Sequence, residues 1–143
     1  MDVQLRPVED ADLPLFFAMH RDPVSVAMAG VPGREAHEFD AHWAKIRVDP
    51  AVVLRSVLVD GEVAGLVVCF PRDGQQELGY WLRQEHWGRG VASVAVAAFL
   101  AEHPSRPLSA GVLGTNAASL RVLAKAGFVE VAREDGSVLF RLD

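Results

Sequence analysis

A glycine-rich turn at Trp87 to Ser93 has the residue types and spacing of an anion-binding site. The segment reads Trp-Gly-Arg-Gly-Val-Ala-Ser and lies between a strand-like run at 77–82 and an apolar, helix-like run at 92–100. Glycine lets the backbone approach a ligand closely and adopt torsion angles that a Cβ disfavours. The first amides of a helix lack internal acceptors, and the helix dipole adds positive character at the same end. The sequence therefore predicts a site for phosphate or pyrophosphate here.

The rest of the chain supplies the elements that would hold this turn. A strand is expected at 3–6 and helices at about 13–20 and 35–47, with Asp22-Pro23 as an interruption and a loop at 30–33. Asp-Gly and Arg-Asp-Gly turns separate apolar runs and predict three consecutive antiparallel strands. These strands are expected at 52–59, 62–70 and 76–82. A helix at 92–102, a strand at 108–113, a helix at 116–126 ended by Gly127, and two strands at 128–132 and 138–142 complete the predicted order.

Length and charge exclude several classes of protein. At 143 residues, half of them hydrophobic, the chain has the size of one domain spanning 1–143. A net charge of -5 argues against a general binder of nucleic acid or of anionic membranes. The single cysteine, Cys69, excludes an internal disulfide and a cysteine metal cluster. No apolar run approaches the ~20 residues that cross a bilayer, and no signal peptide opens the chain, so we expect a cytoplasmic protein.

Two motifs make the chain resemble the GCN5-related N-acetyltransferases (GNAT). The family's acetyl-coenzyme A loop reads Gln/Arg-x-x-Gly-x-Gly/Ala, and Trp87-x-x-Gly90-x-Ala92 stands in that place, with Trp87 departing from the pattern. The segment from Asn116 to Phe128 resembles the family's Asn-x-x-Ser/Ala-x-x-x-x-x-Lys-x-Gly-Phe motif. Short glycine patterns recur by chance, but both motifs occur in order on the expected elements. The Tyr-Trp-Leu…Trp-Gly-Arg-Gly-x-Ala form resembles one branch, the ribosomal-protein N-terminal acetyltransferases.

This resemblance implies an α+β fold, an α/β/α sandwich with a mixed, mostly antiparallel central sheet of about seven strands flanked by helices. The two central strands, at 77–82 and 108–113, would splay and hold acetyl-coenzyme A as co-substrate. The pantetheine arm would then pair with exposed backbone as an added strand. The residues implied to bind the cofactor are Trp81, Leu82, Arg83, Trp87, Gly88, Arg89, Gly90, Val91, Ala92, Ser93 and Asn116.

Three residues are candidates for the chemistry. Glu77 could remove a proton from the amine, although a reference pKa of about 4.3 would require burial or a water relay; the alternative is a strand-edge charge. Asn116 could position the thioester while also serving as a helix N-cap. Many relatives carry a Tyr four residues after Ser119 that protonates the departing thiolate, but Leu123 stands there and the chain's one Tyr is Tyr80. Ser119, or a water that it holds, could substitute; the alternative is a surface hydroxyl.

We therefore interpret the chain as an N-acetyltransferase that transfers an acetyl group to a primary amine by direct attack in a ternary complex. The acceptor would be a protein N-terminus or a small-molecule amine, no metal would be needed, and the protein would be a monomer or a homodimer. The alternative is a non-catalytic coenzyme-binding module or sensor, favoured by the missing Tyr at 123 and the missing Gln or Arg at 87. A dinucleotide-binding domain is disfavoured because the preceding strands form hairpins.

Overall fold

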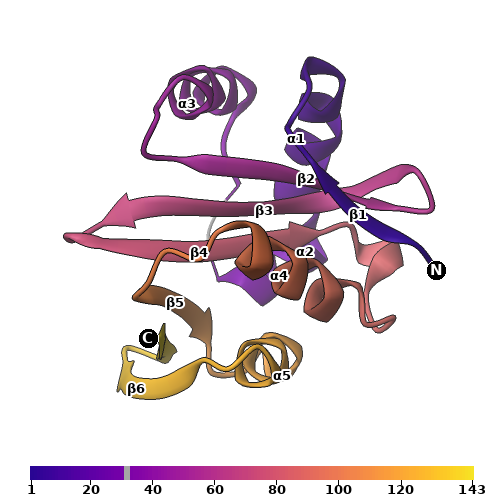
Figure 1. The fold of residues 1–143 in the computed structure, drawn as a ribbon. Helices are drawn as coiled ribbons and strands as arrows, with labels where there is room; N and C mark the ends of the chain where they lie inside the picture. Colours follow the sequence, from indigo (N-terminus) through magenta and orange to yellow (C-terminus); the bar gives the residue numbers. More distant parts are fainter. Residues whose placement is uncertain (31–32) are drawn as a thin grey trace.

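A seven-stranded mixed sheet with helices on both faces makes up the protein (Figure 1). The computed structural model describes residues 1–30 and 33–143. The strand order is β1-β2-β3-β4-β5-β7-β6. The predicted α/β/α architecture is confirmed; of the loop expected at 30–33, residues 31 and 32 lie outside the described part. The strands are β1 Val3–Arg6, β2 Val53–Val59, β3 Glu62–Arg72, β4 Gln75–Leu82, β5 Leu108–Leu113, β6 Val129–Glu134 and β7 Ser137–Leu142.

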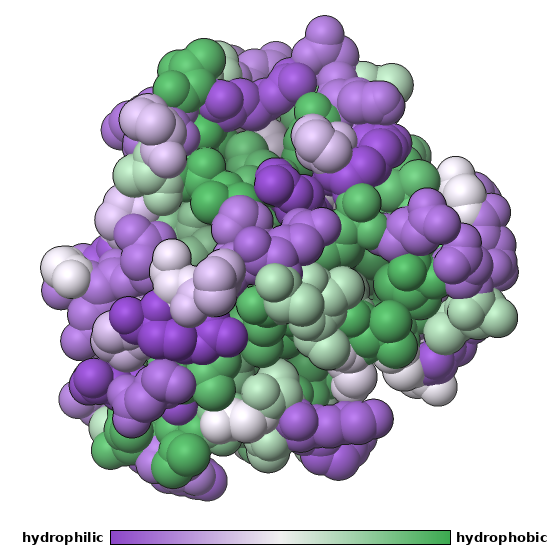
Figure 2. All heavy atoms as spheres, in the orientation of Figure 1, coloured by the Kyte–Doolittle hydropathy of each residue, from purple (hydrophilic) through white to green (hydrophobic). Residues whose placement is uncertain are grey.

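The helices divide between the two faces of the sheet. They are α1 Leu13–Arg21, α2 Pro23–Ala29, α3 Ala36–Arg47, α4 Val91–Glu102 and α5 Ala117–Lys125, with short 3-10 turns at Asp10–Asp12 and Gln84–His86. Phe16 of α1 and Phe39 of α3 belong to one buried cluster, whereas Phe99 of α4 and Leu123 of α5 belong to another. Polar residues spread over the face in Figure 2, with hydrophobic patches between them.

Three hairpins are closed by the same dipeptide, as the sequence predicts. Asp60-Gly61, Asp73-Gly74 and Asp135-Gly136 each place both residues at positive φ, 50° for every Asp and 77–84° for the glycines. Type I′ turns require this conformation, and their twist suits antiparallel neighbours. The turns accordingly join β2 to β3, β3 to β4 and β6 to β7, all antiparallel.

The sheet opens between its two central strands. β4 and β5 are parallel and pair only at Gln76 with Leu108 and at Glu77 with Ser109. Beyond these positions β4 continues to Leu82 and β5 to Leu113 without further ladder pairs between them in the described chain. The strands therefore diverge toward their carboxyl ends, and the opening joins the two faces of the sheet.

The sequence prediction missed α2, because Asp22-Pro23 begins a helix instead of interrupting one. The Asp22 carboxylate accepts hydrogen bonds from the Ser25 N–H at 3.3 Å and from its hydroxyl at 2.7 Å. Pro23 occupies the first turn, where its missing donor costs nothing. α2 ends at Gly30, with φ of 75°, and a Cβ there would lie 2.6 Å from Cδ1 of Leu113. The end of α2 thus packs tightly against the end of β5.

Candidate active site

A cavity of about 740 Å³ occupies the opening between β4 and β5 and is lined from both faces of the sheet. The 87–93 turn and α5 line it on one face, and α1 and α2 line it on the other. Three predicted site residues in the described chain do not line the cavity: Glu77, Arg83 and Arg89. The structure brings ten of the predicted site residues together around the cavity: Trp81, Leu82, Trp87, Gly88, Gly90, Val91, Ala92, Ser93, Asn116 and Ser119.

The glycine turn has the backbone conformation of an anion cradle. Gly88 and Gly90 adopt φ values of 72° and 77°, in the left-handed region that glycine enters without strain. Gly90 is the N-cap of α4, and its carbonyl accepts the Val94 N–H at 3.3 Å. The amides from Val91 to Ser93 therefore precede the first i−4 hydrogen bond of the helix. A Cβ added at either glycine would meet no described atom within 4 Å, so space adjoins the turn.

The edge of β4 presents alternate peptide groups to the opening. The Arg83 N–H donates to the Ala64 carbonyl at 2.8 Å, so the backbone of Arg83 faces β3. Because ladder hydrogen bonds alternate along a strand, the peptide groups of Tyr80 and Leu82 face the opening. The Leu82 carbonyl accepts a hydrogen bond from the Trp87 indole Nε1 at 3.0 Å. The Tyr80 peptide group is therefore best placed to meet a ligand between the strands.

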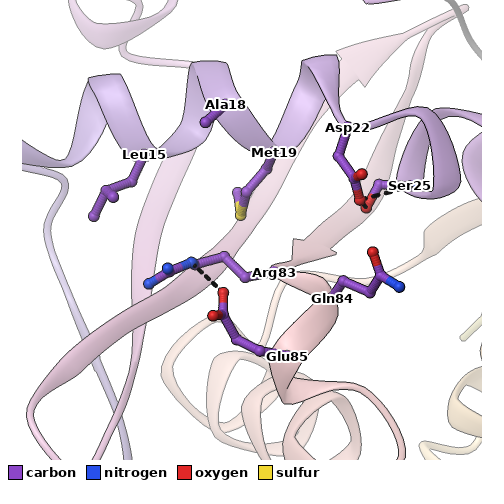
Figure 3. Close-up of a pocket in the computed structure, with 8 residues that line it drawn as sticks. All are labelled: Leu15, Ala18, Met19, Asp22, Ser25, Arg83, Gln84 and Glu85. Carbon is purple, nitrogen blue, oxygen red and sulfur yellow. Dashed lines mark hydrogen bonds and ion pairs between the residues drawn. The ribbon is translucent and has the colours of Figure 1, made fainter.

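The Arg83 side chain lines a second recess, of about 600 Å³, between α1 and the segment after β4 (Figure 3). Its Nε lies 2.7 Å from Oε1 of Glu85, and its Nη1 donates to the Val63 carbonyl at 3.2 Å. The Arg89 guanidinium lies 3.4 Å from Nδ1 of His86. Both arginines predicted to bind the cofactor thus already contact other groups of the chain.

Two cations of α5 face the cavity instead. Arg121 and Lys125 both line it, one turn apart on the helix. Only the position of α5 beside the opening reveals Lys125 as a site residue, because a lysine near a helix end is common on any protein surface.

Ser119 and Tyr80 meet across the opening. The Tyr80 hydroxyl, from β4, donates to Oγ of Ser119, on α5, at 2.9 Å. Ser119 accepts this bond and keeps its own proton to donate to another group. Burial raises the pKa of Tyr80, although the hydrogen bond to Ser119 offsets part of the effect. Leu123, which stands where many relatives carry a tyrosine, is fully buried. The chain's one tyrosine, Tyr80, reaches the site from β4 instead of from α5.

Asn116 uses both ends of its amide within the fold. Its Oδ1 accepts the Ser119 N–H at 3.2 Å as the N-cap of α5, and its Nδ2 donates to the Met28 carbonyl at 3.3 Å. Asn116 therefore joins α5 to α2 at the edge of the cavity. The predicted capping role is present, and the same contacts fix the position of Ser119.

Glu77 lies at the paired end of the two central strands. Its partner in β5 is Ser109, and its Oε2 lies 3.2 Å from Nη1 of Arg72. The side chain is 22% exposed. The structure therefore places this predicted base beside an arginine and away from the part of β4 that faces the opening.

His20 is a site residue that the sequence analysis did not identify. It lies in the last turn of α1, lines the cavity, and has its ring centroid 4.4 Å from that of Trp81. Nδ1 donates to the Phe16 carbonyl at 2.6 Å. Burial lowers the pKa of His20, and the nearby positive charge of Arg34 lowers it further. A histidine at helical spacing carries no local signal, because its role depends on how α1 packs against β4.

The described part of the chain offers no group of three His, Cys, Asp or Glu residues that could hold a metal ion. None of the described helices is both long enough and apolar enough to traverse a bilayer.

Residues 2–129 match the family model described as acetyltransferase (GNAT) domain. The chain belongs to this family. The family match and the acetyltransferases that share the fold support the assignment of this GNAT domain as an acyltransferase. A comparison with curated proteins finds no match.

Solved structures of acetyltransferases share the fold over nearly the whole chain. Spermidine N-acetyltransferase from Vibrio cholerae, in complex with CoA and spermine, is 18% identical with a TM-score of 0.83, covering 97% of this chain and 92% of that one. An acetyltransferase from Thermus thermophilus is 23% identical with a TM-score of 0.81, covering 99% and 97%. The aminoglycoside acetyltransferase AAC(6')-Ib, in complex with coenzyme A, is 18% identical with a TM-score of 0.77, covering 98% and 93%.

Trp87 departs from the family's motif and makes a contact within the chain. At the position where the family's motif carries Gln or Arg, its indole folds back onto the end of β4 and bonds the Leu82 carbonyl. The side chain also packs against the core beneath α4. Trp87 therefore fixes the angle between β4 and the glycine turn.

Proposed function

We propose that this protein transfers an acetyl group from acetyl-coenzyme A to a primary amine, with both substrates bound at once. The observation that carries the proposal is the opening between β4 and β5, with one cavity reaching both faces of the sheet. A co-substrate on the α4 and α5 face and an amine on the α1 and α2 face would meet in this opening. Holding two reactants in contact supplies a large share of the acceleration in such transfers.

The co-substrate would lie along the edge of β4. Its pyrophosphate would meet the amides from Gly88 to Ser93, and its pantetheine amides would pair with the Tyr80 peptide group as an added strand. Arg121 and Lys125 stand on the cavity wall where charge-assisted hydrogen bonds to phosphate oxygens would be available. Two of the solved acetyltransferases of this fold contain coenzyme A, which agrees with this arrangement.

The chemistry would be direct attack of the amine on the thioester carbonyl. The Tyr80 peptide N–H faces the opening and would stabilise the negative charge on the carbonyl oxygen. Ser119, held by Asn116 and by the Tyr80 hydroxyl, would donate a proton to the departing thiolate. Coenzyme A thiol resembles cysteine, with a reference pKa of about 8.5, so this proton would contribute modestly. Glu77 stays a predicted base that would need a water relay.

Binding and turnover can be tested separately with two variants. Gly90→Asp would place a negative charge in the anion cradle, so acetyl-coenzyme A affinity in calorimetry should fall at least 100-fold, about 2.7 kcal/mol. Gly74→Asp is the matched control, because Gly74 has the same φ of 77° in a distant hairpin. It should lose stability but keep affinity. Glu77→Gln should keep affinity; a fall in thiol release would support Glu77 as the base, and unchanged release would remove that role.

A non-catalytic coenzyme-binding module is the second candidate, favoured by the buried Leu123 where relatives carry a proton donor. Tight acetyl-coenzyme A binding without thiol release across a broad amine panel would select it. The Tyr-Trp-Leu…Trp-Gly-Arg-Gly-x-Ala form resembles the ribosomal-protein branch, and the acceptor would be a protein N-terminus or a small-molecule amine.

A further inference from the structure

The α1 and α2 side of the cavity is apolar and aromatic. Val68 and Trp81, from β3 and β4, pack toward the α1 and α3 cluster and line the cavity. Gly79 lies between them without a side chain, and a Cβ there would stand 3.4 Å from Cγ1 of Val68 and 3.9 Å from Cε1 of Phe70. These are ordinary van der Waals distances, so the missing side chain leaves space above an apolar floor. Met28 of α2 also lines the cavity.

The charges around the cavity have one sign. None of the described residues that line it is an Asp or a Glu, and its two cationic side chains, Arg121 and Lys125, lie on α5. The positive charge of Arg34 also lowers the pKa of His20, and His20 in turn lowers the pKa of His42. A polyamine or an aminoglycoside carries several positive charges that would lose water here without gaining a carboxylate, and this is costly. The walls instead suit an acceptor whose body is uncharged.

His20 lines the α1 and α2 side of the cavity, which we call the chamber. Its imidazole has the tautomer that a base needs. A carbonyl oxygen only accepts, so the 2.6 Å contact with Phe16 puts the proton on Nδ1. In the neutral ring Nε2 then carries the lone pair. The Trp81 ring lies against the imidazole at an interplanar angle of 36° and holds it beside β4.

We propose that the acceptor is a small primary amine with an uncharged, apolar body, and that Nε2 of His20 takes the proton this amine releases, in place of Glu77, which lies outside the cavity lining. The inference rests on the acetyl transfer proposed above. As the C–N bond forms, the thioester C–S bond breaks and its electron pair leaves on the coenzyme A sulfur. The nitrogen gives its proton to His20, which passes it to water, and the thiolate takes a proton from solvent, either directly or through Ser119, which regains its own proton from solvent. Because burial lowers the pKa of His20, its neutral form persists at neutral pH.

The acceptor class is tested by acetyl-coenzyme A turnover, followed as thiol release, with three amines. 2-Phenylethylamine should show a kcat/KM at least 100-fold above that of spermidine and of a peptide beginning Met-Leu. Preference for spermidine or the peptide would overturn this inference and leave acetyl transfer intact. Absence of thiol release with every amine would overturn both proposals, and calorimetry with acetyl-coenzyme A would then show whether binding survives.

Gly79→Val tests the chamber itself. The added side chain would fill the space beside Val68 and Phe70, so kcat/KM for 2-phenylethylamine should fall more than tenfold while that for methylamine changes less than threefold. An equal fall for both amines would show that the chamber does not hold the acceptor body.

The proton role of His20 is tested by a pH profile. The wild-type kcat/KM should fall more steeply below the pKa of His20, which lies under the ordinary value of about 6.5. His20→Gln should lower kcat/KM at least 30-fold and remove this change of slope, with acetyl-coenzyme A affinity unchanged. His37→Gln, on the exposed side of α3, is the matched control and should keep the wild-type profile. If the change of slope persists in His20→Gln, the residue is only part of the wall.

Discussion

Two polar clusters of this protein differ in how fully their hydrogen bonds are used. At the base of α1, the Asp12 carboxylate is 2% exposed and accepts from Arg6, from the Glu9 N–H and from the Ser56 hydroxyl, at 2.6–3.0 Å. At the strand opening, Ser119 keeps a proton to donate and His20 keeps a lone pair. The first cluster has no capacity left for a ligand and holds the fold, whereas the second retains capacity for one.

Asp12→Asn should have the largest effect, because it leaves Arg6 without its buried counter-charge. We expect a loss of about 3 kcal/mol in the free energy of unfolding, measured with urea, and unchanged acetyl-coenzyme A affinity. Asp10→Asn is the control: Asp10 also pairs with an arginine, Arg47, but is 93% exposed and should contribute under about 0.5 kcal/mol. Equal losses in the two variants would remove the distinction between a buried and an exposed pair.

Acid should weaken the same cluster. Burial alone would raise the pKa of Asp12, but hydrogen bonds from Arg6, Glu9 and Ser56 together lower it to about 2. A depressed carboxyl pKa stabilises the fold above the unfolded value of about 3.9, and this contribution is lost as the pH falls toward 2. We expect Asp12 to account for about 1.7 kcal/mol of the loss between pH 5 and pH 2.5, out of about 2.5 kcal/mol in all. Urea unfolding at pH 5 and pH 2.5 should show a smaller decrease for Asp12→Asn than for the wild type.

Ser119→Ala should change activity more than stability. The hydroxyl makes one side-chain bond, with Tyr80, so the melting temperature should stay within about 3 °C. Loss of the proton donor should lower kcat about tenfold, below the roughly 100-fold or more that general acids usually contribute, because the thiol leaves readily. A large drop in melting temperature with unchanged kcat would place Ser119 with the saturated, structural groups.

Tyr80→Phe should have the smallest effect. The variant removes the donor to Ser119 but leaves the Ser119 proton in place, so kcat should fall about threefold, as for one lost hydrogen bond. In the double variant with Ser119→Ala the two effects should not add, since both act through one bond. Additive losses would mean that Tyr80 acts independently of Ser119.

Local signals in the sequence account for most of the fold. The three Asp-Gly turns, the glycine turn before α4 and Gly127 after α5 are found where their dihedral angles require them. α2 was missed because Asp-Pro both breaks one helix and begins the next, and only the Asp22 cap bonds distinguish the two cases.

The site was less predictable from sequence, because its contacts join distant parts of the chain. The cradle residues from Gly88 to Ser93 share one local motif and were predicted together. By contrast, Tyr80 and Ser119 are 39 residues apart, and His20 meets Trp81 only because α1 packs on β4. No spacing rule relates such pairs, since packing alone decides which side chains of α1, β4 and α5 converge.

The two ladder pairs between β4 and β5 divide the sheet into a four-stranded and a three-stranded half. The half-sheets meet along a short seam at Gln76 and Leu108, which acts as a hinge line once the strands part. A molecule that paired with the edge of β4 while resting on α5 would lengthen that seam. Binding would then join the two half-sheets over a longer line than the two ladder pairs do in the protein alone.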